Sequence, residues 1–376
     1  MHVLHVVGSS DLGIEENHVF QLATALASRG VRVDVACPHA GSFSDRLRRA
    51  GIEPIVLPLL APRPDEEFEL SWPAVQGLAE VCRSLRPDLV HTHLDPAAFH
   101  GLLAAREAGV RAVIHTAHTF KARSAVVLLT RLGGCHLIAL TRSFAAQLER
   151  AGVPRRQLTV VHNGVPPLRQ SATGGRPLPP MNGIVVGSFV SVPDLLLRAA
   201  AAWRSRLPAF TLLLAGEGPA AASLRQLAAE LGLRARIAFV DASTDHGGLL
   251  SAMDVVCVFP SPDDACPAAV LEAMLAGKAV IAPDLAGIDE LLESGQEGLL
   301  VRPEDPAALT EAVLAMAQDA ALRTRLGTSA RRRVASDFTL ERMVDRTLEV
   351  YRRLMGDLEQ PLRAVPNEIL DPAAAP

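Results

Sequence analysis

The feature that most constrains the fold is a regular alternation of short apolar runs with amphipathic stretches. Residues 3–7 predict a buried strand, and Val19, Leu22, Ala23 and Leu26 then recur at helical spacing before Gly30. Further strand-like runs follow at 31–36, 55–57, 89–91, 112–115, 137–140 and 158–161. Strands that are apolar almost throughout, with helices between them, are typical of a parallel sheet covered on both faces.

The alternation breaks once, at residues 166–182, and then restarts. This segment contains five prolines and two glycines and has no apolar periodicity, which is the composition of a linker. New strand-like runs lie at 184–186, 211–215, 237–240, 255–259, 280–282 and 299–301. We therefore predict an α/β protein with two Rossmann-like, doubly wound parallel-sheet domains that face a cleft.

The same pattern sets the predicted domain boundaries. The first domain covers 1–165, the linker 166–182 and the second domain 183–337. A helix is predicted at 338–356. The remaining residues, 357–376, are rich in proline and alanine and are predicted to be disordered.

Composition excludes several classes of protein. The 37 basic and 41 acidic residues give a net charge of −4, so no global positive field holds nucleic acid. Five scattered cysteines predict neither a disulfide framework nor a cysteine-rich zinc site. The start of the chain does not resemble a signal peptide, and no apolar run is long enough to span a membrane. A cytoplasmic protein is expected.

The most informative segment is 259–282, where a strand, a proline-rich turn and a helix ending at Gly277 are predicted. Asp264 lies in the turn and Glu272 inside the helix. Carboxylates at the end of a parallel strand can accept hydrogen bonds from vicinal sugar hydroxyls, and the first helical turn can face a phosphate. On spacing alone the simpler interpretation is favoured, in which Asp264 caps the helix and Glu272 lies on a solvated face.

This segment resembles the signature of retaining glycosyltransferases of the GT-B fold, the group 1 or family 4 set. Five further motifs fall in the order of that family, namely DLVHTH at 88–93, TAH at 116–118, VHNGV at 161–165, LAGEGP at 214–219 and FTLER at 338–342. The resemblance covers nearly the whole globular chain, and it implies that the helix at 338–356 crosses back to the N-terminal domain. It implies a transferase that moves a sugar from a nucleoside diphosphate sugar to a glycan, lipid or small-molecule acceptor, with retention and without a metal or other cofactor.

The resemblance also implies roles for individual residues. Asp264 would contact the donor sugar, Glu272 would bind the ribose, and His118 would lie beside the reacting carbon; His118 and Asp264 are the candidate catalytic residues. His93 is expected to be less buried than His91 and to border the acceptor pocket. The remaining predicted donor contacts are Gly13, Gly187, Ser188, Gly216, Gly218, Ser261, Ala265 and Cys266.

One departure from the family pattern is serious. The family usually has an arginine and then a lysine that hold the donor pyrophosphate, whereas here Ser188 replaces the arginine and the lysine is missing. Losing two charge-assisted hydrogen bonds weakens binding by roughly 10²- to 10⁴-fold. Lys121 and Arg123 are candidate substitutes. The alternative is a GT-B-like nucleotide- or glycan-binding protein with little catalysis, and a third, weaker one is an epimerase or phosphorylase.

The histidines suggest a competing hypothesis. His91 and His93 are two apart at a predicted strand end, with Asp95 next in register, and such a pair begins the metal site of some hydrolases. His115, His118, His136, His162 and His246 offer no evident supporting ligands, so we predict no metal site and a hydrogen-bonded structural role for His91. Arginine clusters at 46–49 and 331–333 are expected on solvated helix faces, with contact to a membrane surface if the acceptor is a lipid.

Overall fold

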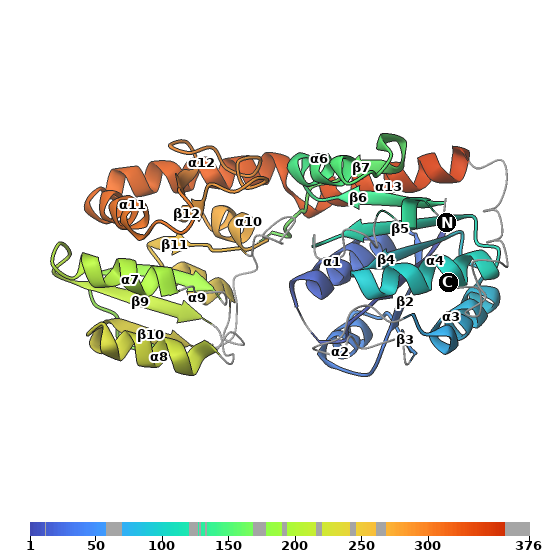
Figure 1. Ribbon diagram of the computed structural model, residues 1–376, viewed down its shortest axis with the longest axis horizontal. Coiled ribbons are helices and arrows are strands. Elements are labelled where there is room, and N and C mark those ends of the chain that lie inside the picture. The colour runs from blue at the N-terminus through green and yellow to red at the C-terminus, as the bar shows by residue number, and fades with distance from the viewer. Residues whose placement is uncertain are drawn as a thin grey trace, which may run out of the picture. The chain divides into compact units, whose positions relative to one another are not determined.

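In this computed structural model the chain divides into two compact units, each built on its own parallel sheet (Figure 1). The first unit comprises residues 1–163 and 340–376, and the second comprises residues 164–339. The structure describes residues 1–11, 13–57, 70–119, 127, 129–131, 134–167, 178–189, 194–215, 220–240, 246–260 and 268–357. The predicted tail and most of the predicted linker lie outside these residues, so both remain predictions.

The first unit contains a seven-stranded sheet in the order β3-β2-β1-β4-β5-β6-β7, in which neighbouring strands are parallel. Its strands are β1 (His2–Val7), β2 (Arg32–Cys37), β3 (Pro54–Val56), β4 (Leu89–His93), β5 (Ala112–Ala117), β6 (Cys135–Ala139) and β7 (Leu158–Val160). Its helices are α1 (Ile14–Ser28), α2 (Ser42–Arg49), α3 (Trp72–Leu85), α4 (Asp95–Glu107), α6 (Arg142–Arg150) and α13 (Leu340–Asp357), with the short η1 (Arg155–Gln157).

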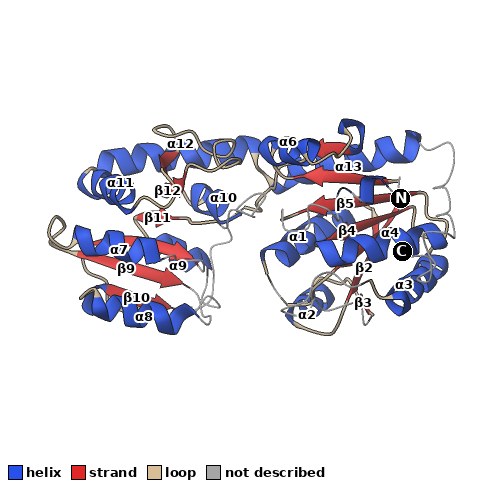
Figure 2. Ribbon diagram, in the orientation of Figure 1, coloured by secondary structure: helices blue, strands red, loops and turns tan. Residues whose placement is uncertain are grey.

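The second unit contains a six-stranded sheet in the order β10-β9-β8-β11-β12-β13, again with parallel pairings. Its strands are β8 (Ile184–Phe189), β9 (Phe210–Ala215), β10 (Ile237–Val240), β11 (Val255–Cys257), β12 (Ala279–Pro283) and β13 (Gly298–Val301). Its helices are α7 (Asp194–Trp203), α8 (Ala220–Glu230), η2 (Arg234–Arg236), α9 (His246–Ala252), α10 (Ala268–Leu275), α11 (Pro306–Gln318) and α12 (Ala320–Asp337). The predicted fold class, two doubly wound parallel-sheet domains, is confirmed (Figure 2).

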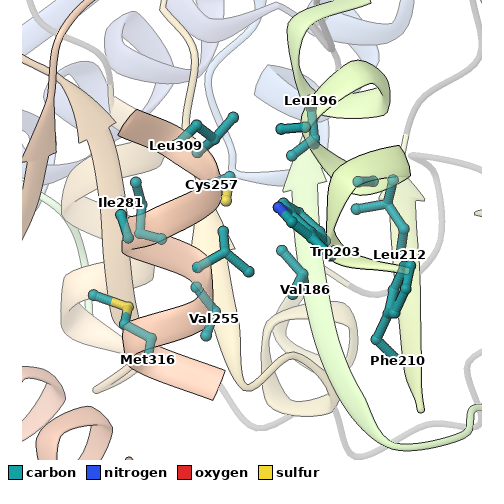
Figure 3. Close-up of a cluster of buried hydrophobic side chains, with 14 of the residues drawn as sticks. Val186, Leu196, Trp203, Phe210, Leu212, Val255, Cys257, Ile281, Leu309 and Met316 are labelled. Carbon is teal, nitrogen blue, oxygen red and sulfur yellow. The ribbon is translucent and has the colours of Figure 1, made fainter. Parts of the chain in front are cut away.

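The core of the second unit lies where its helices pack on the sheet. Trp203 at the end of α7 is fully buried, and its ring meets Phe210 edge-on with 5.7 Å between centroids. Figure 3 shows Trp203 between Val186 on β8 and Leu196 on α7, with Met316 of α11 in the same cluster. Burying side chains of this size contributes about 1.5–3 kcal/mol each, which makes this cluster the main support of the sheet.

The last helix, α13, packs on the first unit although it follows the second unit in the sequence. Its Met343, Val344, Leu348 and Tyr351 join a buried cluster with residues of β1 and α1. Arg29 at the end of α1 forms an ion pair with Asp345. The first unit is therefore completed by a segment more than 170 residues beyond its last strand.

In both sheets the strand order reverses next to the first strand of the unit. The reversal lies between β1 and β4 in the first sheet and between β8 and β11 in the second. In open parallel sheets, ligands bind beyond the carboxyl ends of the strands at such a switch point. The two switch points are therefore where functional side chains are expected.

Candidate functional site

The switch point of the first sheet carries a cluster of buried histidines. His5 lies on β1 directly opposite His91 on β4, His93 ends β4, and His118 follows the last residue of β5. His5, His91 and His93 are 0% exposed and His118 is 7% exposed. His18 on α1 completes the cluster, with its ring edge-on to that of His118 at 4.9 Å between centroids. Topology thus collects histidines from four separate elements at one sheet edge.

His91 has the structural role that the sequence predicted. Its Nδ1 lies 2.6 Å from the Tyr351 hydroxyl, and its Nε2 lies 2.7 Å from the Thr116 hydroxyl. Both ring nitrogens are therefore paired in the interior, so His91 is part of the packing between β4, β5 and α13.

The prediction that His93 is less buried was wrong. Strand β4 extends through His93 in the centre of the sheet, and His93 is 0% exposed. The expected register of Asp95 with the two histidines was also wrong. Leu94 has a positive φ of 67° that ends the strand, and Asp95 begins α4.

Burial keeps these imidazoles neutral. Loss of solvation lowers the pKa of His5 to about 3 and that of His18 to about 4. Burial, followed by repulsion from neighbouring histidines, also lowers the pKa of His93 and of His118 well below the ordinary value. At neutral pH each ring therefore carries one N–H and one lone pair, and it can donate or accept without bringing a charge into the interior.

Two triads in this cluster bring their ligand atoms within 4.8 Å of one another. They are His5, His91 and His93, and His18, His93 and His118. Partners for the His91–His93 pair could not be found from the sequence, because they come from β1 and α1, far away along the chain. His5 and His18 were missed for that reason. The signal that could have found His5 was its position in the first strand, because that strand lies beside β4 at the switch point.

Gly13 stands at the start of α1 but its amide is already engaged. The backbone N–H of Gly13 donates to Glu16 Oε2 at 2.9 Å, as in a capping box. Glu16 is 4% exposed, and burial raises the pKa of its carboxyl. Glu16 was not among the predicted site residues, although a glutamate three positions after the cap is the recognised sequence signal.

The switch point of the second sheet holds Gly187 and Ser188. A Cβ on Gly187 would lie 2.0 Å from Met253 Sδ, so glycine is required there by close packing. Ser188 is 0% exposed, and its hydroxyl has no hydrogen-bond partner within the described part of the chain. The position that the family pattern gives to an arginine is thus an interior one in this chain.

Glu272 is partly buried in the second turn of α10, which ends before Gly277 in a left-handed conformation with φ of 70°. This confirms the predicted end of the helix. Lys278 follows, and its ammonium donates to the carbonyls of Ser251 and Met253 at 2.9 and 2.8 Å, so it closes the end of α9. The other predicted residues lie outside the described residues: Lys121, Arg123, Gly216, Gly218, Ser261, Asp264, Ala265 and Cys266.

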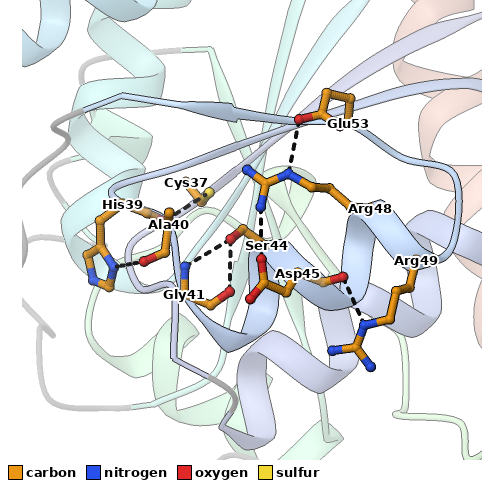
Figure 4. A network of polar contacts seen from close by, with 9 residues as sticks. All are labelled: Cys37, His39, Ala40, Gly41, Ser44, Asp45, Arg48, Arg49 and Glu53. Atoms are coloured by element: carbon orange, nitrogen blue, oxygen red, sulfur yellow. Dashed lines mark hydrogen bonds and ion pairs between the residues drawn. The ribbon is translucent and has the colours of Figure 1, made fainter.

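In the first unit, the loop after β2 is tied together by its own polar groups (Figure 4). The Gly41 N–H donates to the Ser44 hydroxyl at 2.9 Å, and Arg48 pairs with Asp45 and Glu53 at 2.8 and 3.1 Å. Arg46, by contrast, turns to α1, where it donates to Asn17 at 2.8 Å and lies 4.0 Å above the Phe20 ring. The predicted solvated face of α2 is therefore partly an interhelical contact.

Comparison with known proteins identifies relatives over nearly the whole chain. The profile of Glycosyltransferase Family 4 matches residues 15–169, and that of Glycosyl transferases group 1 matches residues 182–319. A D-inositol 3-phosphate glycosyltransferase from Rhodococcus opacus is 30% identical over 92% of this chain and 86% of its own. A glycogen synthase from Mycobacterium tuberculosis is 26% identical over 93% of each chain.

Solved structures show the same fold. HepE from Anabaena, in complex with UDP and glucose, aligns with a TM-score of 0.80 at 21% identity over 94% of this chain and 100% of its own. Sucrose-phosphate synthase from Thermosynechococcus elongatus aligns with a TM-score of 0.74 at 20% identity over 95% and 100%. Within the residues described, no helix is both long and apolar enough to cross a membrane.

Proposed function

Because the chain belongs to the group 1 glycosyltransferases, we propose that it transfers a sugar from a nucleoside diphosphate sugar to a hydroxyl acceptor, with retention of configuration. The relationship at 30% identity over 92% of the chain carries this conclusion. A relative solved with UDP and glucose supports the class of donor. The acceptor class stays open among glycans, lipids and small molecules.

The two switch points supply complementary groups for this reaction. In the first unit, His118 is a neutral imidazole at the end of β5, suited to a hydrogen bond with the donor sugar. In the second unit, Glu272 would accept hydrogen bonds from the ribose hydroxyls and Asp264 from the sugar. The protein's contribution is then electrostatic, because fixed polar groups stabilise the leaving diphosphate and an oxocarbenium-like sugar.

A substitution at Glu272 tests the assignment of the nucleotide site. Glu272→Ala removes two acceptor oxygens, so we expect KM for the donor to rise roughly 10-fold or more while kcat changes little. The measurement is nucleoside diphosphate release from a panel of UDP-, GDP- and ADP-sugars. Glu230→Ala, at the exposed end of α8, is the control. Unchanged donor kinetics in Glu272→Ala would remove Glu272 from the site.

We also propose that the reaction needs no metal ion, because the groups assigned to it are hydrogen-bonding side chains of the chain itself. Turnover should therefore be unchanged after dialysis against EDTA. A loss of activity that Mg²⁺ or Zn²⁺ restores would contradict this, and the two histidine triads would then be the first places to search for the ion.

The buried Ser188 favours a second candidate, a nucleotide- or glycan-binding protein with little catalysis. An uncharged hydroxyl in place of a guanidinium removes a charge-assisted bond to the donor phosphates. Calorimetry with the same panel separates the two. Tight binding of a nucleotide sugar without turnover, with acceptors present, would establish the binding protein, whereas turnover establishes the transferase.

A further inference from the structure

Three of the buried histidines form a continuous chain of imidazole rings, His5–His93–His118. Nδ1 of His5 lies 3.0 Å from Nε2 of His93, and Nδ1 of His93 lies 3.5 Å from Nε2 of His118. The rings of His5 and His93 are stacked, with 5.3 Å between centroids and 22° between planes. His93 therefore uses both of its nitrogens inside this histidine chain.

Neutral imidazoles restrict how such a chain is protonated. Each ring has one N–H and one lone pair, so each contact needs a donor on one side and an acceptor on the other. If His93 accepts at Nε2, its proton is on Nδ1 and it donates to His118; if it donates at Nε2, it accepts from His118. The three rings can therefore adopt only two arrangements, and in each the proton position on His5 determines that on His118.

The His5 end of this histidine chain distinguishes the two arrangements. Nε2 of His5 is buried and has no hydrogen-bond partner within the described residues. In one arrangement this nitrogen carries an orphaned N–H, and in the other it carries only a lone pair. Buried N–H groups without an acceptor are rarer in proteins than acceptors without a donor, so the lone pair is favoured at this position.

It follows that His5, His93 and His118 each carry their proton on Nδ1. His5 donates from Nδ1 to His93, His93 donates from Nδ1 to Nε2 of His118, and His118 keeps its own proton on Nδ1. His91 does not interrupt the chain, since its nitrogens are engaged by Tyr351 and Thr116.

We propose that His5 and His93 are positioning residues that hold His118 as the Nδ1–H tautomer, so that His118 meets the substrate as a hydrogen-bond donor with a fixed ring orientation. The contact with a donor sugar rests on the proposed function, whereas the tautomer is a property of the first unit alone. A histidine in the wrong tautomer presents a lone pair where the reaction needs a proton, which is why the orientation of a catalytic imidazole is fixed by a second group.

A metal ion between His18, His93 and His118 is the competing use of the same atoms, whose ligand nitrogens lie within 4.8 Å. His93 faces His118 with Nδ1, so an ion between these two residues requires a lone pair on that nitrogen. His93 would then donate from Nε2 to His5 and leave the orphaned N–H on His5. The unpartnered Nε2 of His5 therefore favours the hydrogen-bonded chain over the ion.

The tautomers can be measured on the full-length protein without any substrate. With ¹⁵N-labelled histidine and EDTA present, long-range N–H correlation spectra distinguish a protonated nitrogen from one with a lone pair. His118→Gln assigns the His118 signals. We expect Nδ1 of His118 to be protonated and Nε2 to be a lone pair. The opposite tautomer in the unsubstituted protein would overturn the proposal, even if the His5 variants failed to fold.

Two substitutions at His5 separate positioning from packing. His5→Phe keeps the ring shape but leaves Nε2 of His93 without its partner, so the rings of His93 and His118 should lose their fixed orientation and their ¹⁵N signals should broaden. His5→Asn places an amide N–H where Nδ1 was and should restore the sharp signals of both rings. His136→Gln is the matched control, because His136 is buried in the same sheet but pairs with Thr159 at 2.8 Å. Unchanged His93 and His118 signals in His5→Phe would overturn the proposal.

Kinetics provide a second measurement with the nucleotide sugar that the panel identifies. His5→Phe should lower kcat roughly 10- to 100-fold with KM for the donor within about 2-fold, and His5→Asn should recover most of the loss. Equal loss in both variants would indicate a merely structural role. If no nucleotide sugar is turned over, the proposed function fails while the spectra still decide the tautomer.

Discussion

At the scale of single residues, burial decides which hydrogen bonds each histidine at the edge of the first sheet can make. His118 and His93 were recognised from motif order, and both lie at the edge of the first sheet. The exposure of His93 depended on how far β4 continues, which a three-residue apolar run did not reveal. His5 and His18 carried no local signal, because their relevance arises only when β1 and α1 meet β4 and β5.

Gly187 shows how a residue predicted for binding also has a packing role. A methyl group there would overlap Met253 Sδ at 2.0 Å, so Gly187→Ala should lower the free energy of unfolding by about 1–3 kcal/mol. Urea denaturation measures the change, and Gly187→Ala combined with Met253→Ala should show a smaller loss than the sum of the two single variants. Gly77→Ala is the control, since a Cβ at Gly77 meets nothing within 4 Å. Strict additivity would contradict the assigned clash.

At the scale of elements, the alternation of apolar runs located the strands of both sheets to within a few residues. The end of α10 before Gly277 was also predicted from the sequence, because a glycine that can adopt a left-handed conformation just after a helix is a local stop signal. The packing of α13 was suggested only by family resemblance. Nothing in its periodicity indicates that Tyr351 pairs with His91, 260 positions earlier.

The contact between α13 and β4 can be tested through that pair. Tyr351→Phe removes the hydroxyl from Nδ1 of His91 and leaves a buried polar nitrogen without its partner, which should lower the free energy of unfolding by about 1–3 kcal/mol. Arg346→Ala breaks an exposed ion pair with Glu349 on the same helix and should cost less than about 1 kcal/mol. If both variants lowered the free energy of unfolding equally in urea denaturation, the buried hydrogen bond would contribute no more than the exposed ion pair.

At the scale of the whole molecule, the parallel topology explains why so many histidines are neutral and buried. Doubly wound sheets cover both faces of their central strands, and here those strands carry His5, His91 and His93. The alternation of apolar runs, with its single interruption, predicted the two-domain architecture, whereas this polar interior could be seen only after the strands had been placed side by side. The fold was therefore more predictable than the electrostatics of its site.

Neutral buried histidines make stability depend on pH in a definite direction. Burial lowers the pKa of His136 to about 4 and that of His5 to about 3, both from 6.5. Above pH 6.5 these two histidines are neutral in both the folded and the unfolded protein. As the pH falls below 6.5, they become protonated in the unfolded chain at a higher pH than in the folded protein. The free energy of unfolding should therefore fall as the pH drops from 6.5 towards 4, by up to about 1.4 kcal/mol for each unit of pKa shift at each histidine.

Thermal unfolding followed from pH 8 to pH 4 measures this loss. Glu16 has the opposite effect on the free energy of unfolding. Burial raises the pKa of its carboxyl, so the folded protein binds this proton more readily than the unfolded chain, and this stabilises the fold at low pH. One raised carboxyl opposes several lowered histidines, so the net change remains a loss. His136→Gln should flatten the pH dependence relative to the unsubstituted protein, whereas His39→Gln, at an exposed position, should leave it unchanged. A melting temperature that stays constant from pH 6.5 to pH 4 would contradict the neutral state assigned to the whole histidine cluster.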